Sequence, residues 1–295
     1  MASSVGFERG TILLEGSAAG VRGAVWDPDV GRHRAPAYLF GEVAARADAD
    51  GDALAGDLRA AWTAKPRSIE ALRLRDYQAD ALARWYAHER RGIVALPTGA
   101  GKTRVALAAI FELGVPALVL VPTRALLAEW AHALAAALKE PIGIVGDGEN
   151  TIQRVTVMTF ESGFRRLDLA GASFGLLVVD EVHHFGSGAR VEALEACAAP
   201  ARLGLSATAP PPRSEAALRL SELVGPVVIE VPVEELAGTH LAPFDVVCIP
   251  MVLCVDERWT FGLRSPRVVP FSGAIDPWAL RAAARRAAGS SEDAA

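Results

Sequence analysis

A lysine and a threonine follow a glycine-bearing turn in the stretch from Ala95 to Thr103. Gly99 and Gly101 would let the backbone turn so that its N–H groups converge on one anion. Lys102 would add a positive charge for the outer phosphates of a nucleotide, and Thr103 would offer a hydroxyl to a bound Mg²⁺. The residue types and their spacing therefore predict a phosphate-binding loop, made of Pro97, Thr98, Gly99, Ala100, Gly101, Lys102 and Thr103.

The sequence on either side supplies the context that such a loop needs. Residues 92–96 form a compact apolar run closed by a proline, which predicts a short buried strand. Residues 104–113 predict a helix that ends at Gly114. One departure is Leu96, which stands where the strict pattern has a glycine five residues before Gly101. A glycine turn with a chance lysine is the alternative, and the strand–loop–helix order favours the phosphate loop.

An acidic pair, Asp180 and Glu181, directly follows a second apolar run at residues 176–179. Carboxylates at the end of a buried strand are costly unless a cation meets them. We expect Asp180 to bind Mg²⁺ together with Thr103, and Glu181 to orient and polarise an attacking water, with Lys102 completing the catalytic set. The alternative is an Asp that caps a helix with an acidic first turn.

Four polar residues lie beside this acidic pair or after the next predicted strand. His183 and His184 are adjacent, so their side chains point apart, and no Cys or third His lies nearby; a zinc site is therefore not expected. We expect both histidines, with Ser206 and Thr208, to relay the state of the site through hydrogen bonds. Upstream, Gln78 lies on a predicted helix, and its amide could both donate to and accept from an adenine edge.

The order of predicted elements indicates the fold class. Apolar strand-like runs alternate with helical segments, at residues 92–96, 117–121, 142–145, 155–159, 176–179 and 203–206. This alternation predicts a parallel α/β sheet, in which ligands bind at the carboxyl ends of the strands. Residues 1–65 differ in character and predict a small α+β module. In that module Arg32, His33 and Arg34 would suit either a phosphate contact or a solvated basic turn.

Composition sets outer limits on these predictions. The chain has 295 residues, 51% hydrophobic and 22% charged, with a net charge of −5, so a nucleic-acid contact would need a local basic track. Three cysteines, at positions 197, 248 and 254, form no CxxC pair, which predicts reduced thiols in a cytoplasmic protein. No secretory signal and no apolar run of membrane-spanning length occur in the sequence.

Six motifs in order resemble those of superfamily 2 helicases. They are Arg75–Gln78 (glutamine motif), Leu96–Thr103 (motif I), Val121–Leu126 (motif Ia), Met158–Ser162 (motif Ic), Asp180–His183 (a DExH-type motif II) and Ser206–Thr208 (motif III). Ahead of them, Trp26–Pro28 and Arg34–Tyr38 resemble the small N-terminal DNA-contacting domain of XPB-type DNA helicases. The resemblance covers roughly residues 10–253.

This resemblance implies a RecA-like P-loop NTPase lobe with a parallel sheet, preceded by the small α+β domain. The implied domains are residues 1–65 and 66–245, and the remaining segment, 246–295, is atypical for the family and is expected to be partly disordered. ATP and Mg²⁺ would be the cofactors. Arg75 and Gln78 would bind the nucleotide together with the phosphate loop. The implied activity is ATP-driven movement on duplex or junction DNA, along a path lined by Pro122, Thr123, Arg124, Thr159 and Phe160.

The sequence departs from the family pattern in two ways, and both bear on how fast the chain would hydrolyse ATP. Pro210–Glu215 stands where XPB-type proteins have an Arg-Glu-Asp motif, and nothing after Thr208 resembles motifs IV to VI. Arg281, Arg285 and Arg286 fit a solvated helix better than an arginine finger. We therefore expect a first lobe without the second, which hydrolyses ATP slowly unless a second helicase lobe or a nuclease acts in trans. The alternatives are a nucleotide-gated DNA-binding module or truncated helicase with little ATPase, and another duplex translocase such as a restriction or remodelling motor.

Overall fold

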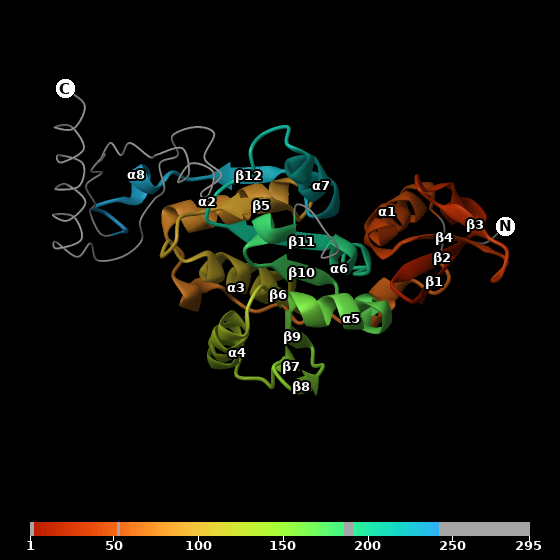
Figure 1. Ribbon diagram of the computed structural model, residues 1–295, viewed down its shortest axis with the longest axis horizontal. Helices are drawn as coiled ribbons and strands as arrows, with labels where there is room; N and C mark the ends of the chain where they lie inside the picture. Colours follow the sequence, from red (N-terminus) through yellow and green to blue (C-terminus); the bar gives the residue numbers. More distant parts are fainter. Residues whose placement is uncertain (1–2, 52–53, 186–190, 242–295) are drawn as a thin grey trace, which may run out of the picture. The chain divides into compact units, whose positions relative to one another are not determined.

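A computed structural model describes residues 3–51, 54–185 and 191–241, and these contain two β-sheets (Figure 1). The larger sheet has the strand order β12-β5-β11-β10-β6-β9-β7-β8. Its pairings are parallel except for the antiparallel hairpin of β7 and β8, so the predicted α/β class with a parallel sheet is confirmed. The strands are β5 (Arg91–Ala95), β6 (Ala117–Val121), β7 (Gly143–Gly146), β8 (Glu149–Thr151), β9 (Val155–Thr159), β10 (Leu176–Val179), β11 (Ala201–Ser206) and β12 (Val227–Glu230).

The six strands predicted from apolar runs all occur, within one or two residues of their predicted bounds. The two that the sequence did not predict, β8 and β12, lie at opposite edges of the sheet. All three residues of β8 are exposed, and β12 alternates between exposed and buried positions. β8 contains no apolar residue and so carries no strand signal, whereas β12 begins with the apolar run Val227–Ile229 and could have been predicted from it.

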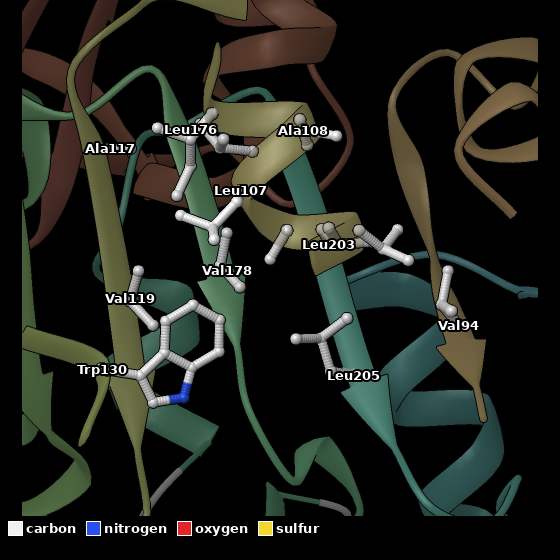
Figure 2. Packing of buried hydrophobic residues seen from close by; sticks show 14 of the residues in the cluster. Val94, Leu107, Ala108, Ala117, Val119, Trp130, Leu176, Val178, Leu203 and Leu205 are labelled. Atoms are coloured by element: carbon white, nitrogen blue, oxygen red, sulfur yellow. The ribbon is translucent and has the colours of Figure 1, made fainter. Parts of the chain in front are cut away.

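Helices cover both faces of this sheet. One face packs against α2 (Asp76–Ala87), α3 (Lys102–Leu113) and α4 (Arg124–Leu138), and the other against α5 (Phe160–Ala170), α6 (Val191–Glu195) and α7 (Glu215–Leu223). Successive strand residues point to opposite faces, so Val94 and Val119 join the first core while Ile93 and Leu118 join the second. Figure 2 shows residues of the first core from neighbouring strands gathered against α3.

The smaller sheet has the order β1-β2-β4-β3 and is antiparallel throughout. Its strands are β1 (Ser4–Glu8), β2 (Thr11–Glu15), β3 (Val25–Asp27) and β4 (Arg32–Pro36), and α1 (Phe40–Asp50) packs on it through Phe40 and Val43. Trp62 lies edge-on to Phe40 and donates a hydrogen bond of 2.9 Å to the Ala172 carbonyl. An α+β module is thus present, and its predicted boundary at residue 65 stays a prediction.

Two predictions concern regions that the structure does not describe or describes only in part. The predicted segment at 246–295, with Arg281, Arg285 and Arg286, lies outside the described residues, as do Cys248 and Cys254. Cys197 is a buried free thiol, and burial raises its pKa. In the described part of the chain, the helices are too short or too polar to cross a bilayer.

A fully buried arginine, Arg202, anchors the amino end of β11. Its Nε donates to the Ala199 carbonyl at 2.9 Å, and its Nη1 donates to the carbonyls of Leu194 (3.0 Å) and Leu223 (2.9 Å). Its Nη2 donates to the Cys197 carbonyl. Leu194 and Leu223 lie in the last turns of α6 and α7, where helix dipoles favour a cation.

The charge of this arginine survives its burial. Burial lowers the pKa of Arg202 to about 9, so the guanidinium remains protonated at neutral pH. Main-chain carbonyls replace the water that the guanidinium loses, and the ring of Tyr38 lies 6.0 Å away. Arg202 therefore joins the start of β11 to two helices and to the smaller module.

We predict that Arg202→Ala lowers the free energy of unfolding by about 3 kcal/mol or more, because it leaves buried carbonyls without donors and opens a cavity. Urea unfolding followed by circular dichroism measures the change. Arg166→Ala, at an exposed position of α5, is the matched control and should stay within about 0.5 kcal/mol of the unaltered chain. Equal stability of the two variants would contradict a structural role for Arg202.

Candidate nucleotide-binding site

The predicted phosphate loop connects β5 to α3. Gly99 and Gly101 adopt φ of +82° and +80°, the left-handed region that glycine reaches without strain. Thr98 and Gly99 are exposed, whereas Pro97 and Ala100 are buried. Lys102 begins α3, and its Nζ donates to the Leu96 carbonyl at 3.2 Å. A glycine turn opening onto a helix N-terminus is an arrangement that binds phosphate.

Asp180 follows β10 and is almost fully buried, with 7% of its surface exposed. Its Oδ2 accepts a hydrogen bond of 2.8 Å from the Trp130 indole Nε1, and its Oδ1 accepts one of 3.0 Å from the Glu181 N–H. Each carboxylate oxygen keeps a further lone pair for a ligand. The sequence predicts Trp130 only as a core residue, because nothing in its spacing along α4 reveals a partner 50 residues away.

Glu181 has a backbone conformation that side chains rarely adopt. Its φ is +48°, which costs a non-glycine residue on the order of 1–2 kcal/mol. One carboxylate oxygen, Oε2, lies 3.4 Å from His183 Nδ1. The turn after β10 therefore holds the Glu181 side chain in a strained and defined place, half-exposed beside the buried Asp180.

Hydrogen bonds join the acidic motif to the loop after β11. The Ser206 hydroxyl donates to the Thr208 carbonyl at 2.7 Å, and His183 Nδ1 lies 3.1 Å from the same hydroxyl oxygen. Because the hydroxyl hydrogen goes to Thr208, Nδ1 carries the proton and donates to Ser206. Burial, with His184 nearby, lowers the pKa of His183, so the ring is neutral at pH 7. The exposed His184 ring lies 4.2 Å from the His183 ring, so the expectation that the two side chains point apart was wrong: both lie in one tight helical turn, Val182–Phe185.

The phosphate loop reaches the same serine through its main chain. The Leu96 N–H donates to the Ser206 carbonyl at 3.0 Å, and β11 lies between β5 and β10 in the sheet. The structure thus brings the predicted phosphate loop, Ser206 and the Asp180 turn to neighbouring strand ends.

The oxygen ligands near these strand ends suit a magnesium ion bound to phosphate. The Thr103 hydroxyl and the Asp180 carboxylate are hard oxygen ligands of the kind that Mg²⁺ takes, usually with phosphate oxygens and water. No cluster of three or more His, Cys, Asp or Glu side chains placed to hold a metal occurs within the described ranges. Such a site would therefore depend on the nucleotide to supply the remaining ligands.

The structure shows the predicted adenine reader, Gln78, bound to the protein itself. Gln78 is 1% exposed, its Oε1 accepts from the Arg75 N–H at 2.9 Å, and its Nε2 donates to the Ala100 carbonyl at 2.8 Å. One amide hydrogen and one lone pair remain for a base. Arg75 donates from Nη1 to the Tyr77 hydroxyl at 3.0 Å and to the His240 carbonyl at 3.4 Å. Adenine recognition by Arg75 and Gln78 stays a prediction.

The residues predicted to line a DNA path follow β6 and β9, which are adjacent parallel strands. Thr123 caps α4 by accepting from the Leu126 N–H, and the exposed Arg124 pairs with Asp147 at 3.1 Å. Pro122 is half-buried between β6 and this cap. These positions lie at the carboxyl ends of the strands, on the same side of the sheet as the phosphate loop. Their DNA contacts stay a prediction.

At the end of β9, Thr159 and Phe160 differ in what they offer to a ligand. The Thr159 hydroxyl caps α5 and lies 2.9 Å from the Ser162 hydroxyl. Phe160 is 2% exposed, and its ring packs at 4.0 Å from the Phe185 ring. In this arrangement the Phe160 ring is part of the core, so residues next to it, and not the ring itself, would contact DNA.

The basic stretch of the smaller module is neutralised by carboxylates. Arg34 forms ion pairs with Asp27 at 2.8 Å and Glu8 at 2.9 Å, and Arg32 pairs with Glu15 at 2.8 Å. The Arg34 guanidinium lowers the pKa of Asp27 through its side-chain hydrogen bond. A phosphate at this stretch would have to displace those carboxylates.

Two family models match the chain. Residues 71–211 match the model described as type III restriction enzyme, res subunit, which spans the phosphate loop and the acidic motif. Residues 5–53 match the model described as the xeroderma pigmentosum group B helicase damage recognition domain. The second match coincides with the sheet and helix of the smaller module.

Two curated proteins and one solved structure are similar to part of the chain. The chain is 40% identical over 201 residues to the DNA 3′-5′ translocase XPB2 of Sulfurisphaera tokodaii, covering 68% of this chain and 45% of that protein. It is 30% identical over 210 residues to the DNA 3′-5′ helicase XPB of Mycobacterium tuberculosis, covering 67% of this chain and 38% of that protein. The solved Hef helicase domain of Pyrococcus furiosus is 24% identical, with a TM-score of 0.44, over 55% of this chain and 38% of that one.

The chain thus spans less than half the length of the curated relatives named above. One of the two family models describes the XPB damage recognition domain, and the other covers the six motifs from Arg75 to Thr208 that resemble those of helicases. The chain is therefore similar to XPB-type helicases of superfamily 2, both in the smaller module and in the part that carries the phosphate loop.

Proposed function

We propose that this chain is the ATP-binding half of an ATP-dependent DNA helicase or translocase of superfamily 2, coupling the binding and hydrolysis of ATP–Mg²⁺ to movement on duplex DNA. The observation that carries the proposal is a group of hydrogen bonds at the carboxyl ends of β5, β10 and β11. Ser206 bonds the phosphate loop through Leu96 and the acidic motif through His183. Phosphate-binding and water-activating groups are thereby held on one rigid frame.

Each residue has a distinct part in this proposal. The loop N–H groups and Lys102 bind the phosphates, and Thr103 and Asp180 hold Mg²⁺, which when bound offsets phosphate charge. Trp130 orients the Asp180 carboxylate by donating to one of its oxygens. Glu181 positions the attacking water and accepts its proton. Ser206, Thr208 and the two histidines pass the occupancy of the site to neighbouring strand ends.

DNA is the partner that we propose for the strand ends of β6 and β9, because the relatives named above are described as a DNA translocase and a DNA helicase. Pro122, Thr123, Arg124 and Thr159 would contact the phosphate backbone, and the smaller module would add a second DNA contact. We propose that efficient hydrolysis also needs a second helicase lobe.

A nucleotide-gated DNA-binding module is the second candidate function. It is favoured by one observation: the candidate DNA-contacting residues and the phosphate loop all follow the carboxyl ends of strands in one sheet. ATP binding could then alter DNA affinity without turnover.

Lys102→Ala should weaken ATP binding by at least tenfold, because it removes a charge-assisted contact with phosphate. Isothermal titration with ATP and Mg²⁺ measures the effect. Lys139→Ala, at the end of α4 and outside the loop, is the control and should bind ATP like the unaltered chain. Undiminished binding by the Lys102 variant would remove the lysine from the site.

Glu181→Gln should keep ATP affinity within about twofold and lower DNA-stimulated hydrolysis by about 10²-fold or more, because the amide cannot accept the proton of the water. Phosphate release with and without duplex DNA gives the rates, measured with a separately made second helicase lobe present. If the unaltered chain and the variant hydrolyse ATP equally slowly while ATP still shifts DNA affinity, the gated binding module is the correct function.

Glu181→Gly should unfold at a higher urea concentration than Glu181→Ala, with a difference in stability of about 1 kcal/mol. Both variants lack the carboxylate, and only alanine keeps a Cβ that strains a left-handed backbone. Equal stability, or greater stability of the alanine variant, would show that position 181 does not hold this backbone conformation in solution.

A further inference from the structure

The carbonyl of Ala100, in the middle of the phosphate loop, accepts two hydrogen bonds from side chains of one helix. The Tyr77 hydroxyl donates to it at 2.9 Å, and the Gln78 Nε2 donates to it at 2.8 Å. Ala100 itself is fully buried. Both donors lie in the first turn of α2, so the helix fixes the direction in which this carbonyl points.

The direction of that carbonyl determines the direction of the next N–H group. In a trans peptide the carbonyl and the following N–H point to opposite sides. With the Ala100 carbonyl drawn toward α2, the Gly101 N–H faces away from α2. Phosphate loops bind their anion with such inward-facing N–H groups, so α2 orients one of the donors of the cradle.

The packing around this peptide leaves little freedom. A Cβ at position 101 would lie 2.5 Å from Gln78 Nε2 and would displace the Gln78 amide from its hydrogen bonds, and the φ of +80° also favours glycine. The Gln78 amide is itself oriented, because its Oε1 accepts from the Arg75 N–H. The Arg75 guanidinium donates to the Tyr77 hydroxyl oxygen at 3.0 Å, which leaves the hydroxyl hydrogen for the Ala100 carbonyl.

We propose that the Tyr77 hydroxyl is a positioning group for the phosphate loop, holding the Ala100–Gly101 peptide so that the Gly101 N–H faces the phosphates of the bound nucleotide. Tyr77 acts through the loop and not through the base. This inference rests on the proposed function, since it assumes that the loop binds a nucleotide. The spacing of Tyr77 along the helix is that of a core residue, so residue type and spacing alone do not reveal this role.

Tyr77→Phe tests the proposal, since it removes the hydroxyl and keeps the ring against His240. We expect MgADP to bind about three- to tenfold more weakly, the effect of one neutral hydrogen bond, and adenosine to bind within twofold of its original affinity. Both affinities are measured on the full chain by competition with a fluorescent ADP analogue. Tyr86→Phe is the matched control, because Tyr86 lies on the same helix and its hydroxyl bonds Glu112 instead of the loop.

A double-mutant cycle with Gln78→Ala sharpens the test. Each single variant leaves the Ala100 carbonyl one donor, whereas the double variant leaves it buried without any. The loss of MgADP affinity in the double variant should therefore exceed the product of the single losses.

The possible results separate this inference from the function on which it rests. Equal loss of ADP and adenosine affinity, or no loss at all, would overturn the positioning role of Tyr77 and leave the proposed function standing. Failure of the unaltered chain to bind MgADP would overturn the proposed function, and this inference with it.

Discussion

The parallel pairing of β11 with β5 on one side and β10 on the other is the constraint on which the site depends. Ser206 pairs with Ala95 across β5, and Gly204 pairs with Val179 across β10, so all three strands end at the same edge. The phosphate loop and the acidic turn are far apart in sequence. This register, more than any local feature of either loop, makes them neighbours.

The two ends of β11 are held by different kinds of interaction. At its amino end, the buried guanidinium of Arg202 is surrounded by carbonyls from the ends of two helices. At its carboxyl end, Ser206 bonds both the phosphate loop and His183. A strand fixed at both ends cannot slide relative to its neighbours, and hydrogen-bonded groups at its carboxyl end keep their mutual distances. Tyr38 of the smaller module lies beside the amino end, so the module contributes to this frame.

The sequence was sufficient for features that depend on local pattern. The types and spacing of Gly99, Gly101 and Lys102 predict a phosphate loop, and the apolar runs predict the central strands. The acidic pair after a buried strand predicts a cation site for the same reason, and that site stays a prediction. The left-handed turn and the central strands are confirmed, because each depends on residues that are adjacent in the sequence.

The features that escaped prediction depend on contacts between distant residues. Trp130 reaches Asp180, and Tyr77 reaches Ala100, only because the fold brings separate elements together. Phe160 follows a strand end where a ligand contact was expected, yet it packs on Phe185 because the residue after β9 turns into the second core. The positive φ of Glu181 has no signature in residue type, since glutamate is not a residue that favours it.

The most direct test of this account is a crystal structure of the chain with a non-hydrolysable ATP analogue and Mg²⁺. The account predicts that the outer phosphates lie against the backbone of residues 98–103, with the metal between the Thr103 hydroxyl and the Asp180 carboxylate. Nucleotide density at another surface, or a metal bound without either of these two residues, would contradict it.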